Sequence, residues 1–494
     1  MSDAEPIRCS PPRSLAELEA CLNRDLLYLQ QPAKDWVPPR RHAAFGRMLD
    51  VAVIGAGMAG LAAGFALKRL GVFNIRLYDR AEPGFEGPWE TYARMETLRS
   101  PKELAGPALG LANLTFRAWF EAQFGPDAWE RLGRIPRPQW MDYLRWYRKV
   151  ANLPVENGVA LTGLAGDADA VILSLRDGAG ARRVAARHMV LATGRDGLGG
   201  PFVPPLFRTL ERRWWAHSSD PIDFRALKGR RVAVIGAGAS AVDNAAEALE
   251  AGAAKVVMLV RRGDVPRINK GMGVAHPGMS LGFHALSPDR RWAMTRYIAD
   301  CAIPPPRNSM LRASRHGNFA VLTGCDIRDA RSEGPQLVLE TARGRLTFDF
   351  VILATGFTVD WARRPELAAL AGRIALWRDR FVPEGAADSE FAEHPFLGPG
   401  FEFVEKAPGT LPWAGRVHCF NFAATLSHGK ITGDIPAISA GAERVAEAIA
   451  GALFVEDYEA HYRRLVDYDT PELLGDEWSA SGVDAASATE GAGT

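Results

Sequence analysis

Three glycines and one aspartate within residues 51–79 have the types and the spacing needed to bind a dinucleotide. Gly55 allows a tight turn, Gly57 lets the backbone approach a pyrophosphate, and Gly60 lets the next helix pack closely on the preceding strand. The N-terminus of that helix favours the negative charge of a phosphate. Asp79 stands where an acidic side chain accepts hydrogen bonds from a ribose hydroxyl group. The set therefore predicts a nucleotide site.

The elements around these residues must be a strand, a helix and a second strand. Residues 51–54 are apolar, too few for a helix, and typical of a buried parallel strand. The helix should begin at Met58 and Ala59 and end near Gly71, where glycine tolerates a positive φ. Residues 75–79 form the second strand. Strand, glycine motif, helix, strand and acid in this order are stronger evidence for a nucleotide site than a GxGxxG pattern alone. The alternative explanation is a glycine-rich turn without a ligand.

A second set of the same kind follows a strand at residues 230–235. An alanine-rich helix runs to Ala251, and another strand covers residues 255–260. Alanine replaces the third glycine of the fingerprint, which the fingerprint tolerates. The residues assigned to this second turn are Gly236, Gly238, Ala239, Ser240 and Ala241.

The two sets differ at the end of the second strand. Asp79 closes the first set, whereas Arg261 and Arg262 stand at the corresponding place in the second. A 2′-phosphate is repelled by a carboxylate and attracted by guanidinium groups. We therefore predict FAD at the first site and NADPH at the second. The alternative for Arg261 and Arg262 is a solvated basic turn.

Two similar strands that end in Ala-Thr-Gly, at residues 189–194 and 351–357, suggest that the chain leaves one domain and later returns to it. The small residues there, Thr355 and Gly356 among them, let the backbone pass close to a nucleotide. The predicted fold class is α/β, with two Rossmann-like domains and the NADPH domain inserted in the FAD domain. The predicted divisions are an extension at 1–48, FAD-binding parts at 49–210 and 336–470, the NADPH-binding domain at 211–335, and a tail at 471–494.

Several further elements follow from local patterns. Residues 14–31 should form a helix docked on the body, and residues 115–150 are helical and rich in aromatic side chains that are typical of a core. Residues 265–330 should form loops and short helices between the domains, where a ligand could sit. Residues 415–422 resemble a strand. The tail from Ser479 onward is predicted to be disordered.

A helix is predicted to begin near Asp434 and Ile435, with Asp434 as its N-cap. Apolar residues recur on one face of this helix as far as Ile449. Its N-terminus could point at the pyrimidine edge of a flavin, where the free amides would stabilise negative charge on the reduced ring.

Composition limits the class of protein. The chain has 494 residues, 24% charged and 47% apolar, with a formal net charge of +1, which gives no electrostatic case for nucleic acid or for an anionic membrane. No apolar run is long enough to span a membrane, and no signal peptide is evident. The five scattered cysteines, without a CxxC motif, predict reduced thiols in a cytoplasmic protein and disfavour a dithiol reductase. The histidines lack metal-ligand spacing, so no metal is predicted.

Residues 48–455 resemble the class B flavin-dependent monooxygenases, which comprise flavin-containing monooxygenases, Baeyer–Villiger monooxygenases and amine N-hydroxylases. The two glycine motifs in this order, the sequence 236–243 and the second Ala-Thr-Gly signature carry the resemblance. Gly87-Pro88-Trp89 resembles the flavin loop of the group, which makes Trp89 a cofactor-binding candidate. Glu211 and Arg213 occupy the Phe and Gly positions of the group's linker motif, so the Baeyer–Villiger version is poorly matched.

The resemblance also supplies three substrate or catalytic candidates. Lys102 matches a loop lysine that binds the substrate carboxylate in the N-hydroxylases, and Asn269 matches an asparagine that touches substrate and cofactor. Both have a simpler interpretation, as a helix-start lysine and a turn asparagine. His217 matches the linker histidine and is open between linker hydrogen bonding and a functional role.

The function that the resemblance implies is an FAD- and NADPH-dependent monooxygenase. It would form a C4a-(hydro)peroxyflavin and oxygenate a small molecule with O2, with N-hydroxylation of an amine or amino acid favoured. Baeyer–Villiger or sulfide oxygenation, a reductase or oxidase without oxygenation, and a redox-sensing flavoprotein remain as alternatives. Arg-rich loops in residues 267–315 favour an anionic substrate. The oligomeric state is left open, with a homo-oligomer among the options.

Overall fold

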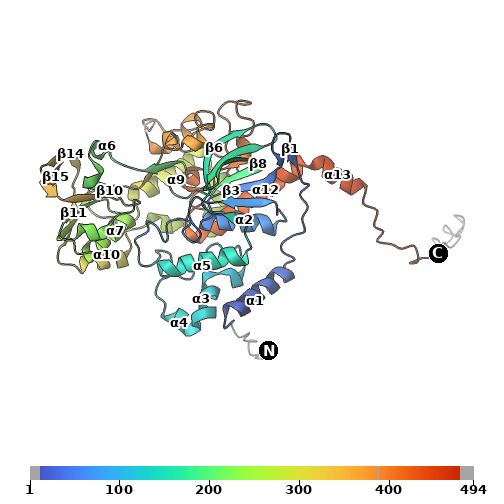
Figure 1. Cartoon of the computed structure of the whole chain (residues 1–494), viewed down its shortest axis with the longest axis horizontal. Helices are drawn as coiled ribbons and strands as arrows, with labels where there is room; N and C mark the ends of the chain where they lie inside the picture. The colour runs from blue at the N-terminus through green and yellow to red at the C-terminus, as the bar shows by residue number, and fades with distance from the viewer. Residues whose placement is uncertain (1–11, 387–388, 479–494) are drawn as a thin grey trace, which may run out of the picture.

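The computed structural model describes residues 12–386 and 389–478, and the predicted disordered tail from Ser479 lies outside these residues. Figure 1 shows two α/β units side by side, one holding β3, β8, α2 and α12 and the other holding β10, β11, α7 and α10. We call them the first and the second domain.

The first domain is built on a seven-stranded sheet with the order β5-β4-β3-β8-β7-β6, and β19 pairs with β8. The strands β5, β4, β3, β8 and β19 are parallel, while β7 and β6 add antiparallel edges. β7 and β8 form a hairpin in which Asp177 pairs with Gly180. The strands are β3 (Leu49–Ile54), β4 (Ile75–Tyr78), β5 (Val155–Glu156), β6 (Ala160–Gly166), β7 (Val171–Asp177), β8 (Gly180–Leu191) and β19 (Val417–His418).

Helices cover this sheet and form an aromatic layer. α2 (Met58–Arg69) follows β3, and α12 (Ile438–Glu456) packs on α2. The predicted aromatic core is confirmed, because Trp129, Trp140 and Tyr143 are fully buried. The predicted N-terminal helix is α1, and its buried Leu18 and Leu22 dock it on the body. The remaining helices here are α1 (Leu15–Tyr28), α3 (Phe116–Phe124), α4 (Pro126–Arg131), α5 (Arg137–Val150), α11 (Thr425–His428) and α13 (Tyr458–Val466).

The second domain holds a parallel five-stranded sheet with the order β10-β17-β11-β12-β13. A three-stranded antiparallel sheet, β14-β15-β16, lies at its side. The strands are β10 (Trp215–His217), β11 (Arg231–Ile235), β12 (Lys255–Val260), β13 (Phe319–Thr323), β14 (Ile327–Glu333), β15 (Gln336–Thr341), β16 (Gly344–Phe348) and β17 (Phe350–Leu353). Its helices are α6 (Pro205–Arg208), α7 (Ala239–Glu250) and α10 (Arg307–Ser314), whereas α8 (Pro277–Gly282) and α9 (Pro288–Cys301) of the same chain segment pack on α12 and α11 of the first domain.

The second domain is inserted in the first, as predicted, but it ends later than predicted. The boundary after residue 335 is wrong, because β15 and β16 complete the antiparallel sheet and β17 pairs with β11 in the middle of the parallel sheet. The second Ala-Thr-Gly strand therefore belongs to the second domain. The chain returns through β18 (Phe357–Val359), which pairs with β9 (Gly199–Pro201) on the outgoing segment.

Three local predictions also need correction. Only Val417 and His418 form a strand within residues 415–422, because a 3₁₀ turn occupies residues 414–416. Residues 265–330 contain the 14-residue helix α9 and the sheet strand β13, as well as loops. Asp434 precedes a 3₁₀ turn, Ile435–Ala437, and its side chain makes no capping bond, so α12 itself begins at Ile438.

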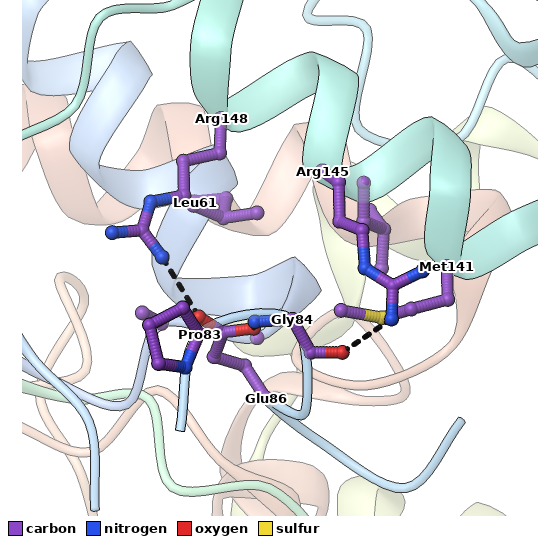
Figure 2. Close-up of a pocket in the computed structure, with 10 residues that line it drawn as sticks. Leu61, Pro83, Gly84, Glu86, Met141, Arg145 and Arg148 are labelled. Carbon is purple, nitrogen blue, oxygen red and sulfur yellow. Dashed lines mark hydrogen bonds and ion pairs between the residues drawn. The ribbon is translucent and has the colours of Figure 1, made fainter. Parts of the chain in front are cut away.

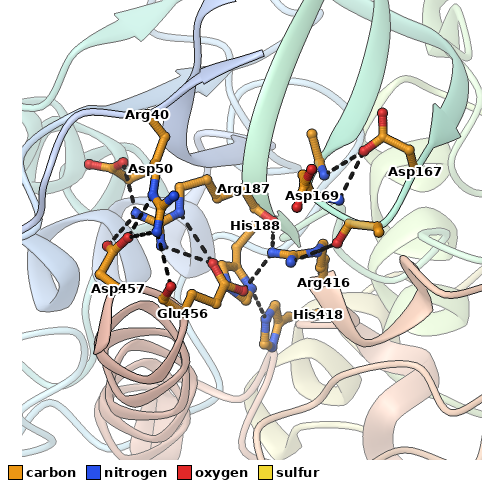
Figure 3. A network of polar contacts seen from close by, with 12 residues as sticks. Arg40, Asp50, Asp167, Asp169, Arg187, His188, Arg416, His418, Glu456 and Asp457 are labelled. Carbon is orange, nitrogen blue, oxygen red and sulfur yellow. Dashed lines mark hydrogen bonds and ion pairs between the residues drawn. The ribbon is translucent and has the colours of Figure 1, made fainter. Parts of the chain in front are cut away.

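A buried charged cluster fixes the C-terminal end of α12 to the base of the first sheet (Figure 3). Arg187 of β8 is 2% exposed, and its guanidinium donates to Asp457 Oδ2 at 2.8 Å and to Glu456 Oε2 at 2.9 Å. Arg40 donates to the other oxygen of Asp457 at 2.7 Å. Because buried charges are stable only when they are paired, this cluster holds the junction between α12 and α13 in one arrangement.

Candidate nucleotide-binding sites

The first glycine turn is as tight as the sequence predicts. Gly55 has φ +101°, and a Cβ on it would lie 2.4 Å from the carbonyl oxygen of Ala192. A Cβ on Gly60 would lie 1.8 Å from the carbonyl oxygen of Gly55. Gly57 is different, since the nearest atom to its Cβ position is Gly87 Cα at 3.8 Å. The turn thus closes on both sides of Gly57 and leaves the backbone of Gly57 open to an approaching group.

Asp79 lies directly against this turn. Its Oδ2 accepts a hydrogen bond from the backbone N–H of Ala56 at 2.7 Å, and its Oδ1 accepts one from Ala81 at 2.8 Å. Burial raises the pKa of the Asp79 carboxyl group, and the two backbone hydrogen bonds oppose that rise. The side chain therefore stands at the strand end beside the glycines, as the sequence predicts.

A cavity of about 270 Å³ opens beside Gly57 (Figure 2). The turn and helix α2 form one wall and helix α5 the other, with Met141, Arg145 and Arg148 on the α5 side. Arg145 donates to the carbonyl oxygen of Gly84 at 2.7 Å, and Arg148 donates to the buried Glu86 at 2.8 Å. Two guanidinium groups and an open glycine backbone on one cavity fit the pyrophosphate of a dinucleotide.

Arg145 and Arg148 were not among the residues predicted from the sequence. They lie in a helix whose aromatic residues dominate its pattern, and their own signal is only a spacing of three, which places both on one face. Because α5 packs against α2, it brings both arginines to the cavity beside the first glycine turn.

Trp89 and Ile435 approach the same region from two distant parts of the chain. The ring of Trp89 meets that of Trp140 edge-on with 6.2 Å between centroids, and Arg137 donates to the carbonyl oxygen of Trp89. A Cβ on Gly106 would lie 3.1 Å from Trp140 and 3.6 Å from Ile435, so these side chains are close. Trp140 is buried, and its indole N–H has no hydrogen-bond partner in the described part of the chain. A buried donor without a partner fits a site built for a polar ligand.

The second glycine turn repeats the first with one change. Gly236 has φ +137°, and its Cβ would lie 2.5 Å from the carbonyl oxygen of Ala354. No atom lies within 4 Å of a Cβ on Gly238. Ala241 is fully buried at the position of Gly60, and Ala239 and Ser240 begin α7 as predicted. The backbone of Gly238 is therefore open in the same way as that of Gly57.

Thr355 and Gly356 join this turn to the connecting segments. Thr355 donates to the carbonyl oxygen of Phe202, and the carbonyl oxygen of Gly356 accepts from the Phe202 N–H at 2.8 Å. His217 Nε2 lies 3.0 Å from the same carbonyl oxygen, and His217 Nδ1 lies 2.7 Å from Ser219 Oγ. His217 is thus hydrogen-bonded within the linker, which agrees with the simpler of its two interpretations.

Arg261 and Arg262 follow the last residue of β12, and both are exposed. Arg262 donates to the carbonyl oxygen of Asp300 at 2.7 Å. Arg261 makes no hydrogen bond or ion pair with any of the described residues. Its guanidinium group is free at the strand end where the first domain has Asp79.

The surroundings of Lys102 and Asn269 do not resemble a substrate site. Lys102 Nζ donates to the carbonyl oxygen of Trp129 at 2.6 Å and lies 4.8 Å from the centroid of the Trp129 ring. Asn269 precedes the 3₁₀ turn Lys270–Val274, and its side chain makes no capping bond. Lys102 therefore ties its loop to α4.

Comparisons with known proteins agree with this geometry. Residues 49–274 match the family described as pyridine nucleotide-disulphide oxidoreductase. The chain is 41% identical over 467 residues to the FAD-dependent urate hydroxylase of Xanthomonas campestris pv. campestris, covering 94% of this chain and 98% of that protein. Two solved structures share the fold. The FAD-bound cadaverine monooxygenase of Erwinia amylovora has a TM-score of 0.64 at 15% identity, covering 82% of this chain and 95% of that one. The ornithine hydroxylase of Pseudomonas aeruginosa has a TM-score of 0.63 at 16% identity, covering 82% and 100%.

The chain belongs to the class B flavin-dependent monooxygenases, and it is a flavoprotein oxidoreductase. The predicted family is thereby confirmed, and FAD and NADPH are the cofactors of this family. The four cysteines among the described residues, Cys21, Cys301, Cys325 and Cys419, are free.

Within residues 12–386 and 389–478, no helix is both long and apolar enough to cross a membrane. Over the same ranges, no three His, Cys, Asp or Glu side chains are grouped so that they could hold a metal ion.

Proposed function

We propose that this enzyme hydroxylates urate, or a closely related anionic purine, with FAD, NADPH and O2. The observation that carries the proposal is the 41% identity to a FAD-dependent urate hydroxylase, which extends over 94% of this chain. Identity of this extent includes both nucleotide turns and the segments between them. The reaction balances as urate, O2, NADPH and a proton giving hydroxylated urate, NADP⁺ and water.

The first domain would hold FAD. Its pyrophosphate would lie against Gly57 and the N-terminal residues Met58 and Ala59 of α2, with Arg145 and Arg148 opposing the phosphate charge. Asp79 would accept hydrogen bonds from the ribose. Bound FAD, once reduced by NADPH, activates O2 and supplies one oxygen atom to the substrate.

Residues of three further segments would surround the ring system of FAD. The buried Trp140 and the partly buried Trp89 would form an aromatic wall that keeps water away. Asp434 and Ile435 stand at a turn whose backbone N–H groups precede α12, so they would face the pyrimidine edge.

The second domain would hold NADPH through Gly238 and the N-terminus of α7. Arg261 would pair with the 2′-phosphate, assisted by Arg262, because two guanidinium groups replace the carboxylate of the first site. Thr355 and Gly356 lie between the two domains and would hold the connecting backbone in place.

The anionic character of urate agrees with the composition of the segment between the domains. Arg267 and Lys270 are exposed there, and Asn269 lies between them. Urate is a monoanion at neutral pH, so a basic entrance would favour its approach.

A second candidate is N-hydroxylation of an amine or amino acid, which the sequence resemblance favours. Proteins of similar fold act on cadaverine and ornithine. The hydrogen bond from Lys102 to Trp129 counts against it, because this lysine would have to leave that bond to reach a substrate carboxylate. Replacing Lys102 with Ala therefore separates the two candidates. Urate turnover would keep its KM, whereas the KM of an amino acid substrate would rise about tenfold or more.

The experiment is a comparison of substrates with the purified holoenzyme. NADPH oxidation, hydrogen peroxide and substrate loss are followed together for urate, ornithine, lysine and cadaverine. The proposal predicts that urate alone raises NADPH oxidation and is consumed in equal amount with little hydrogen peroxide. Consumption of an amine instead, with urate unchanged, would replace the proposal by the second candidate.

A further inference from the structure

Helix α13 carries an exposed apolar stripe on one face. Tyr458 is 53% exposed, Tyr462 50% and Leu465 71%. Spacings of four and three place these side chains above one another on a helix. Figure 1 shows α13 leaving the body of the first domain beyond α12, with the chain continuing outward. The stripe therefore faces away from the protein to which the helix is attached.

One flank of α13 is fixed to the body, so the direction of the stripe is set. Asp457, which precedes the helix, is fully buried between Arg187 and Arg40 (Figure 3). Arg464 donates to the carbonyl oxygen of Trp36 at 2.9 Å, and the His461 ring lies 5.6 Å from that of Trp36. The apolar face is thus presented in one orientation by a buried ionic anchor.

The apolar surface extends beyond the helix in both directions. The side chains that contribute to it, each at least half exposed, are Phe454, Val455, Tyr458, Tyr462, Leu465, Val466, Tyr468, Leu473, Leu474 and Trp478. An aromatic side chain can bury roughly 150–250 Å², so the five aromatic residues alone expose an area on the order of 500 Å². The aliphatic residues bring the surface close to the ~800 Å² per partner of a standard interface, and above what monomers usually expose.

Charges beside the stripe indicate what it pairs with. Glu459 and Arg463 are both exposed and lie four residues apart on the same flank of the helix. When two such helices pack antiparallel, equal flanks face each other. Glu459 of one helix then opposes Arg463 of the other, and the pair occurs twice across a two-fold axis. The helix is therefore complementary to itself.

We propose that α13 packs antiparallel against α13 of a second copy of this chain and forms a two-fold symmetric homodimer. The apolar stripes make the centre of the contact, and the two Glu459–Arg463 pairs set its direction. Residues 467–478 extend the contact along the partner with their Tyr, Leu and Trp side chains.

Other occupants fit this surface less well. Residues 479–494 contain no side chain larger than valine apart from acidic ones, so they cannot fill a surface of Tyr and Leu side chains. An anionic membrane would be repelled, because residues 467–478 contain five acidic residues and no basic one. A second copy matches both the apolar surface and the charge pattern.

The test measures molecular mass in solution, by analytical ultracentrifugation of the full chain with its cofactors. The wild type should have twice the chain mass at micromolar concentration. The double substitution Tyr462→Glu with Leu465→Glu should give a monomer. Leu311→Glu is the matched control, since Leu311 is 50% exposed on α10 of the second domain and should leave the dimer intact.

Charge reversal tests the antiparallel arrangement separately. Glu459→Arg or Arg463→Glu alone places like charges opposite each other and should raise the dimer dissociation constant on the order of tenfold or more. The two substitutions together restore opposite charges and should restore the wild-type value, which a defect in folding would not do. A wild type that stays monomeric at about 100 μM, a double reversal that is weaker than either single change, or a monomer that binds zwitterionic lipid vesicles would each overturn the proposal.

Discussion

The two glycine turns of this protein share a backbone design and differ in two places. Gly55 and Gly236 both have a positive φ, and each lies against the carbonyl oxygen of the residue that follows a neighbouring strand, Ala192 after β8 and Ala354 after β17. The third glycine, Gly60, becomes Ala241 in the second domain, and Asp79 becomes Arg261. The first difference concerns packing of the helix on the strand. The second concerns the charge offered to the nucleotide.

This comparison shows which features of a nucleotide turn are fixed and which are free to change. A Cβ at Gly60 would come within 1.8 Å of backbone, whereas the second turn holds the Cβ of Ala241 without exposure. The charge at the strand end can change sign without altering the strand, because Asp79 and Arg261 each follow the last paired residue of their strand. Helix packing therefore belongs to the fold, and we propose that the terminal charge decides the choice of cofactor.

The largest expected effect comes from exchanging the packing residues. Gly60→Ala should remove bound FAD and lower the free energy of unfolding by about 3 kcal/mol, since the added Cβ meets backbone that cannot move easily. Ala241→Gly should cost only about 1 kcal/mol, the usual loss for glycine in a helix. Flavin absorbance of the purified protein and urea unfolding measure both. Equal effects of the two substitutions would break the comparison.

The next effect concerns Asp79. Asp79→Ala removes a charged acceptor, and loss of such hydrogen bonds costs about 1.5–3 kcal/mol. The dissociation constant of FAD should rise on the order of thirtyfold, while the affinity for NADP⁺ stays unchanged. Fluorescence titration of the apoprotein gives the first value and calorimetry the second. A parallel loss of NADP⁺ affinity would show that Asp79 supports the structure as a whole.

Substitution of Arg261 and Arg262 should affect the binding of NADPH and leave the binding of FAD unchanged. Arg261→Ala with Arg262→Ala should lower the preference for NADPH over NADH about tenfold to a hundredfold, because the 2′-phosphate loses its cationic partners. FAD content should not change. Anaerobic rates of flavin reduction by the two nucleotides measure the preference, with the exposed Arg24→Ala as control. An unchanged preference would support the interpretation as a solvated basic turn.

The smallest effect is an opposite response to acid of single buried residues, two histidines in the first domain and one aspartate in the second. Burial lowers the pKa of His394 to about 4 and that of His418 to about 3 in the first domain. The unfolded chain takes up protons on these histidines below about pH 6.5 while the folded domain does not, so stability falls as pH drops toward these values.

Asp243 in the second domain shows the opposite shift. Burial raises its pKa to about 6. Folded Asp243 takes up a proton below about pH 6, before the unfolded chain does, so the contribution of Asp243 to stability grows as pH falls from 6 toward 4. Between pH 7 and pH 5 we expect a loss on the order of 1–2 kcal/mol per histidine and a gain of about 1 kcal/mol from Asp243. Urea unfolding of the wild type and of single variants at the two pH values measures both contributions. His394→Gln should reduce the loss, and Asp243→Asn should abolish the gain.

The sequence predicts much of the fold because the decisive signals are local. Strand, glycine turn, helix and terminal charge lie within about thirty residues in each domain, so their order could be read directly. The end of the inserted domain could not, because β17 pairs with β11 across more than a hundred residues and its apolar pattern suits either sheet. Pairing of distant strands depends on the whole topology.

The candidate site shows the same division between local and distant information. The glycines, Asp79 and Arg261 are where their motifs place them. No sequence pattern predicts Arg145 and Arg148, because they join the first site only through the packing of α5 on α2. Lys102 had a motif in its favour but is held by Trp129, a contact between residues 27 positions apart that no pattern records.

The central claim is that the second domain delivers hydride from NADPH to FAD held by the first, and that the reduced enzyme oxygenates urate. A single-turnover measurement tests it most directly. The holoenzyme is reduced without oxygen by one equivalent of NADPH, then mixed with aerated buffer and urate, and urate and hydrogen peroxide are quantified. The account predicts loss of about one urate per flavin, with little hydrogen peroxide. Full reoxidation with one hydrogen peroxide per flavin and urate unchanged would contradict it.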